Sequence, residues 1–142
     1  MAAYNFLLAF TAFVSLLLAY TAWQRRLAAG APALTVILLS SAWWLLCYVI
    51  PLADMGDADA LFLRARLIFP GVVLIPPATL VFALTFTGKA ARPTRAQLAA
   101  LAVEPAIVLS AVAYPGLHDY FYDTWRGRAE DGVFVGGPLY WA

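Results

Sequence analysis

The sequence predicts an all-α integral membrane protein, and two observations lead to that fold class. Of the 142 residues, 64% are hydrophobic and only 12% are charged, whereas a soluble domain carries about 25% charged residues. Four long runs are almost free of charge, and each can supply the roughly 20 apolar residues of a membrane-spanning helix. Membrane-spanning strands are not expected, because unpaired backbone cannot face lipid and so short a chain cannot close a transmembrane barrel. A soluble domain and a disordered chain are both excluded.

Each uncharged run predicts one transmembrane helix. The helices are expected at about residues 4–23, 33–52, 67–87 and 96–115. The first helix has no basic residue before it and is followed by Arg25 and Arg26, which is the reverse of a cleaved signal peptide. We therefore expect it to remain in the protein as a membrane span.

Loop charges predict the orientation of these helices. The loops after the first and third helices hold five basic residues and no acid, namely Arg25, Arg26, Lys89, Arg92 and Arg95. The opposite side holds four basic and seven acidic residues. Basic loops remain in the cytoplasm. The N-terminus and the tail of residues 116–142 are therefore expected outside the cell membrane.

Small residues recur on one face of the first helix, at Ala9, Ala12, Ser15, Ala19 and Ala22. Small faces let membrane helices approach closely, so this face is expected to meet another helix, while Phe6, Phe10, Phe13 and Leu17 lie elsewhere. Prolines 70, 76 and 77 predict a kink in the third helix, and Pro105 predicts a bend in the fourth.

Glu104 is the one ionisable residue inside a predicted span, about eight residues from its start, or roughly 12 Å deep. A charge at such depth is costly, and acids placed there usually mark a site or a proton path. The alternative is structural: a hydrogen bond to a threonine of the third helix, or to a carbonyl freed by Pro105.

Three further residues are candidates for ligand binding. Trp43 and Trp44 fall near the middle of the second helix, where they either fill space between helices or form the wall of a ligand cavity. His118 lies just after the fourth helix, as an ordinary interfacial residue or as a sensor of pH or ligand.

The sequence offers little for catalysis. Cys47 is the single cysteine and His118 the single histidine, so we expect no disulfide and no metal site. No phosphate-binding or nucleophile motif is found, and Asp57 and Asp59 are read as solvating charges in an exposed loop. A net charge of +1 argues against nucleic-acid binding. No catalytic residue and no cofactor is therefore expected.

Several ordered motifs resemble one membrane family. Arg25-Arg26 leads to Gly30-Ala31-Pro32, and Ala42 to Tyr48 reads AWWLLCY. RLIFPG at 66–71 opens the third helix, and the stretch from Pro76-Pro77 to FALTFTGK at 82–89 closes it, followed by Thr94-Arg95. Pro105, His118 and GPLYW at 137–141 complete the set. This ordered set resembles the N-terminal seven-helix sensor region of membrane histidine kinases. That family often has a Thr-Asn pair before the histidine, where this sequence has Tyr114-Pro115.

The resemblance implies that the chain is the first four helices of a truncated seven-helix bundle, and that it is not itself an enzyme. It implies a sensory input domain of a two-component system, passing a membrane or extracytoplasmic signal to cytoplasmic kinase domains. The implied partners are the lipid bilayer, the remaining helices, those kinase domains and a second copy in a homodimer. A transporter fragment and a small structural membrane protein are the alternatives, and the coding sequence after Ala142 would separate the three.

Overall fold

The computed structural model describes residues 2–49, 58–88 and 93–114, and within those residues every regular element is an α-helix. The helices are α1 (Ala2–Gln24), α2 (Ala31–Val49), α3 (Ala58–Phe86) and α4 (Arg95–Ala113). All four are long and apolar enough to cross a membrane. The predicted all-helical membrane fold is thereby confirmed. The predicted tail of residues 116–142, with His118, lies outside the described residues.

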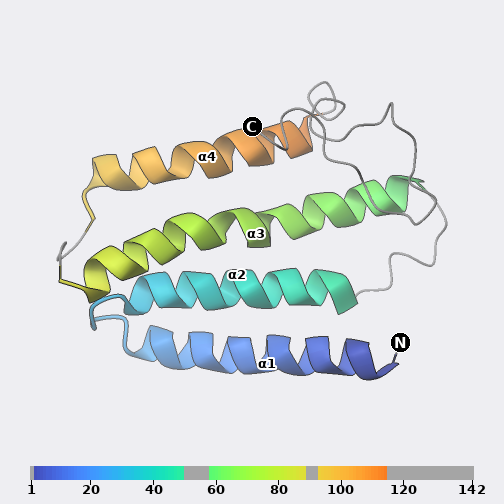
Figure 1. The fold of residues 1–142 in the computed structure, drawn as a ribbon, viewed down its shortest axis with the longest axis horizontal. Coiled ribbons are helices and arrows are strands. Elements are labelled where there is room, and N and C mark those ends of the chain that lie inside the picture. The colour runs from blue at the N-terminus through green and yellow to red at the C-terminus, as the bar shows by residue number, and fades with distance from the viewer. Residues whose placement is uncertain (1, 50–57, 89–92, 115–142) are drawn as a thin grey trace. The chain divides into compact units, whose positions relative to one another are not determined.

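The chain divides into two compact units, residues 1–105 and 106–142. The first unit contains α1, α2, α3 and the beginning of α4. Figure 1 shows α1, α2 and α3 side by side, each antiparallel to the helix before it. The helix α2 is central, because it packs against both α1 and α3. In the described part of the second unit, which continues α4, Ala111 and Val112 are buried.

The face between α1 and α2 is built from small side chains. On α1, Ala12, Ala19 and Ala22 are 0%, 2% and 9% exposed, whereas Phe10 and Phe13 are each 56% exposed. The small face that the sequence predicted is therefore the buried one. Close approach of this kind is what holds membrane helices together, because lipid offers no hydrophobic drive for large side chains to leave it.

A tight loop turns the chain from α1 into α2. Backbone bonds run from Arg25 N to Ala22 O and from Ala28 N to Arg25 O, at 3.0 and 2.8 Å. Gly30 ends the loop with φ at +80°, a conformation that other residues rarely adopt. The helix starts at Ala31, two residues before the predicted start, because a proline in the first turn, here Pro32, breaks no helical bond.

A single glycine lets α2 and α3 approach closely. A Cβ on Gly71 would lie 2.8 Å from the Ser40 carbonyl oxygen and 3.1 Å from the Trp44 backbone nitrogen. Both atoms belong to the backbone of α2, so neither can move aside cheaply. Gly71 is thus a point of close approach between the two helix backbones.

The helix α3 extends beyond its apolar part. Its candidate membrane span, Arg66–Phe86, agrees with the prediction of 67–87, but the helix itself begins at Ala58. Alanine, leucine and arginine are strong helix formers, which favours extension past the membrane-spanning part. Asp59 therefore lies in a helix and not in the loop that the sequence suggested, while Asp57 lies outside the described residues. Figure 1 shows α3 running as one helix through its prolines.

The start of α4 is fixed by reciprocal capping that the sequence reading did not identify. The Thr94 backbone nitrogen donates to the Gln97 side-chain oxygen at 2.9 Å, and the Gln97 backbone nitrogen donates to the Thr94 hydroxyl at 3.3 Å. This is a capping box, which satisfies backbone donors that the first turn of a helix leaves unpaired. It explains why α4 begins at Arg95.

Candidate functional site

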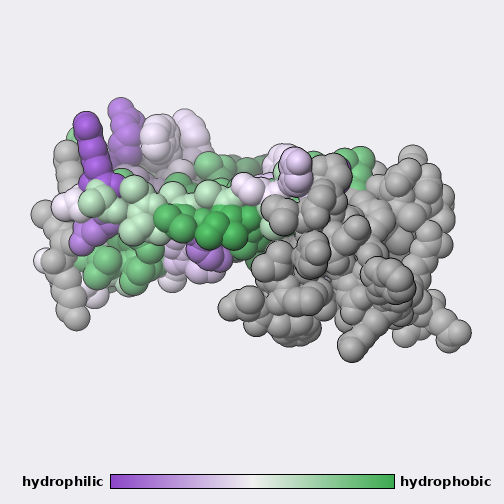
Figure 2. Space-filling view, turned by 90° about the horizontal axis from the view of Figure 1, so that it is seen from above, coloured by the Kyte–Doolittle hydropathy of each residue, from purple (hydrophilic) through white to green (hydrophobic). Residues whose placement is uncertain are grey.

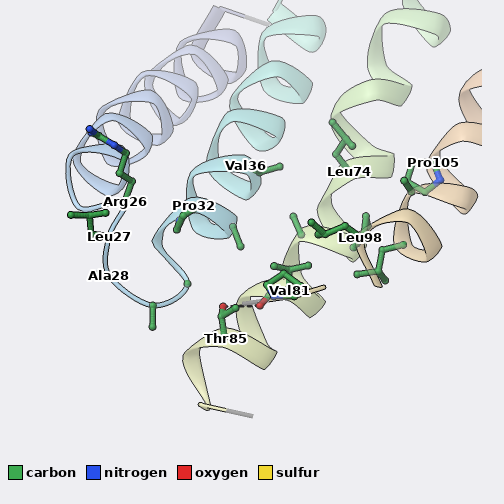
Figure 3. A pocket seen from close by; sticks show the side chains of 18 residues that line it. Arg26, Leu27, Ala28, Pro32, Val36, Leu74, Val81, Thr85, Leu98 and Pro105 are labelled. Carbon is green, nitrogen blue, oxygen red and sulfur yellow. Dashed lines mark hydrogen bonds between the residues drawn. The ribbon is translucent and has the colours of Figure 1, made fainter. Parts of the chain in front are cut away.

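The first unit contains a cavity of about 630 Å³ near the loop that joins α1 to α2. Three segments line it: that loop with the first turns of α2, the second half of α3 and the first half of α4 (Figure 3). Small-molecule sites in proteins range over about 300–1,000 Å³. The cavity is therefore large enough for a ligand.

The interior of the cavity is apolar. Leu74, Ala78 and Val81 line it from α3, and Leu98 and Leu101 line it from α4. Such a surface favours hydrocarbon over a polar ligand, because polar groups lose their hydration there without gaining hydrogen bonds.

Only two of the lining residues carry polar side chains, Thr85 and Arg26. The Thr85 hydroxyl donates back to the Val81 carbonyl at 2.7 Å, as the dashed line in Figure 3 marks. The Arg26 guanidinium carbon lies 5.7 Å from the centre of the Trp23 ring, and Figure 3 shows the charged end directed away from the cavity. The cavity thus combines an apolar interior with a cation at its rim.

Two prolines add backbone acceptors near this wall. Pro77 and Pro105 both line the cavity, and each lacks the N–H that would bond to the carbonyl four residues earlier. Those carbonyls belong to Val73 and Leu101. Beside the cavity, α3 and α4 therefore each lack a backbone hydrogen bond. A membrane helix can bend where such a bond is missing.

The two candidate tryptophans lie outside the lining of this cavity. The Trp43 indole nitrogen donates to the Leu67 carbonyl of α3 at 2.7 Å, and the Cys47 sulfur lies 3.5 Å from the same oxygen. Trp44 meets Tyr48 edge-on, with ring centres 6.2 Å apart. The observed contact of Trp43 is thus an interhelical hydrogen bond between α2 and α3.

Glu104 is exposed on α4 and does not line the cavity. Among the described residues, no hydrogen bond or ion pair involves its side chain. The threonines in and just after α3 do not bond to Glu104. The hydroxyls of Thr79, Thr85 and Thr87 instead donate to carbonyls of α3, at 2.8, 2.7 and 2.7 Å. A binding role for Glu104 stays a prediction, as it does for Trp43, Trp44 and His118.

The described residues contain no group of three or more metal-ligating side chains.

The four apolar helices define a multi-pass membrane protein, with a cavity between helices of its first unit. The family described as the N-terminal 7TM region of histidine kinase matches residues 7–142. The chain belongs to this family. Only residues 1–6 lie outside the match, too few to form a kinase domain. No curated protein and no solved structure matches the chain.

Proposed function

We propose that this chain is the transmembrane input region of a sensor kinase, and that it passes a membrane or extracytoplasmic signal to cytoplasmic kinase domains. The observation that carries the proposal is the family match over residues 7–142, together with four helices able to cross a membrane. The signal acts as a population shift: it favours one of two helix arrangements, and the kinase responds to the arrangement.

The contacts between helices suggest which parts move. Small residues and Gly71 bring α1, α2 and α3 together. The cavity lies where α4 and α3 leave space. In the proposed mechanism the first three helices form a stable frame and the first half of α4 shifts against α3.

The orientation belongs to the same proposal. The loop at the cavity end carries Arg25 and Arg26, and α4 begins there with Arg95. Basic residues favour the cytoplasmic side. The cavity end then faces the kinase, and the N-terminus of α1 lies outside the cell.

Glu104 is the candidate signalling residue on α4. It lies nine residues after Arg95, or roughly 14 Å along the helix. A carboxyl group at that depth is costly in lipid without a partner. In the proposal its partner comes from helices that follow α4 in the complete bundle, so Glu104 reports how those helices pack.

The test uses the full-length kinase in proteoliposomes with ATP. Glu104→Gln keeps the size and the hydrogen-bonding capacity, and it should leave expression normal while the rate of autophosphorylation changes. Glu104→Leu should change the rate further, because it also removes the hydrogen bond. Val103→Leu, at the exposed neighbouring position, is the matched control and should behave as the wild type does. If both Glu104 variants match the wild type in expression and in rate, Glu104 has no part in signalling.

A further inference from the structure

We propose that the cavity between α3 and α4 binds an anionic phospholipid, with an acyl chain inside it and the headgroup at Arg26. The proposal concerns ligand binding and does not depend on the signalling role. Three observations carry it: the apolar interior, the cation at the rim, and the absence of acidic residues from this end of the helices.

The interior selects hydrocarbon. Its walls are aliphatic side chains and prolines. The Thr85 hydroxyl already donates to the carbonyls of Val81 and Phe82, at 2.7 and 3.1 Å. A flexible acyl chain needs no hydrogen bond, and its neighbours in the bilayer are equally apolar. A soluble polar ligand would lose hydration here and gain nothing in return.

The rim selects negative charge. Arg25, Arg26 and Arg95 are exposed at this end of the helices, and no acidic residue occurs in residues 1–53 or 60–103. Figure 2 shows strongly hydrophilic residues gathered toward one end, beside a hydrophobic band. Basic pockets between membrane helices favour anionic headgroups. This charge complementarity holds whichever side of the membrane the end faces.

Arg26 also has the chemistry of a headgroup contact, and its charged end, directed away from the cavity, places the headgroup outside the cavity (Figure 3). Its guanidinium carbon lies 5.7 Å from the centre of the Trp23 ring, and tryptophan is enriched at membrane interfaces, where lipid headgroups lie. The guanidinium group offers several donors suited to a phosphate, which accepts two parallel hydrogen bonds. The phosphate and the acyl chain of one lipid can therefore be bound at the same site.

The test counts lipids retained by the full-length kinase. The delipidated protein is incubated with equal phosphatidylglycerol and phosphatidylcholine in mixed micelles, and native mass spectrometry identifies what remains bound after washing. We expect retained phosphatidylglycerol and little phosphatidylcholine. Equal retention of the two lipids would contradict an anionic site.

Two matched pairs of variants locate the lipid. Ala102→Trp fills the cavity and should abolish retention, whereas Ala100→Trp adds the same ring at a position of α4 outside the lining and should not. Arg26→Gln should weaken retention about five-fold, whereas Arg66→Gln, far from the cavity lining, should leave it unchanged.

The variants also separate other occupants. If Ala102→Trp changes the oligomeric state and leaves lipid retention as in the wild type, a second copy fills the cavity and the proposal fails. If no lipid is retained even by the wild type, later helices of the bundle fill it, and the proposal fails equally. The loop variant Arg26→Gln keeps the test decisive even if Ala102→Trp does not fold.

Discussion

At the scale of single residues, backbone contact at Gly71 sets the spacing of α2 and α3. We expect Gly71→Ala to destabilise the membrane region by about 1–3 kcal/mol, because the added methyl group has no room against the Ser40 carbonyl. Thermal unfolding of the full-length protein in detergent, followed by tryptophan fluorescence, measures the loss.

Gly88 supplies the control for that prediction. A Cβ there meets nothing within 4 Å, and its φ of +71° is the only obstacle. Asparagine tolerates this conformation, so Gly88→Asn should cost little, whereas Gly71→Asn should cost more than Gly71→Ala. If asparagine is tolerated equally well at both positions, steric contact between the helices is not what makes Gly71 necessary.

Some of these buried contacts follow from the pattern within one helix, and others do not. The burial of Ala12 and Ala19 followed from helical periodicity, which is a local property. The contact between Gly71 and Ser40, and the bond from Trp43 to the Leu67 carbonyl, join positions more than 20 residues apart. No pattern within one helix indicates which neighbour it meets or at what height. The cavity was missed for the same reason, since its lining comes from three separate segments.

At the scale of elements, the hydrophobic runs predicted all four helices and placed their apolar parts closely. The ends differed where another rule applied: Pro32 fits the first turn of α2, α3 continues past its apolar part, and Thr94 with Gln97 caps α4. Hydropathy reports where a helix enters lipid, whereas capping and helix propensity decide where the helix itself begins and ends.

Packing of α1 against α2 leads to a prediction at this scale. Ala12→Leu should weaken the pair by about 1–3 kcal/mol, because it inserts a large side chain where the present one is 0% exposed. Phe13→Leu installs the same residue at the next position, which is 56% exposed, and should have little effect. Unfolding of the full-length protein at increasing concentrations of a denaturing detergent would compare the stabilities of the two variants. Equal stability of the two variants would mean that the small face of α1 does not hold the helices together.

At the scale of the whole molecule, the number of spans links orientation to function. A family of seven-helix regions has an odd number of membrane crossings, so the two ends of the region lie on opposite sides. In the proposal α1 is the first of the seven helices, so if α1 begins outside, whatever follows the seventh helix lies in the cytoplasm, where a kinase finds ATP. If α1 begins inside, a kinase attached after the region would lie outside and could not act.

The accessibility of residue 29 in intact cells therefore tests the sensor proposal most directly. In a Cys47→Ala background, Ala29→Cys and Ala3→Cys place single thiols at exposed positions near opposite ends of α1. We expect a membrane-impermeant thiol reagent to label position 3 in intact cells and to label position 29 only after the membrane is opened. Labelling of position 29 from outside, with position 3 protected, would contradict the orientation and with it the proposed route from membrane signal to kinase.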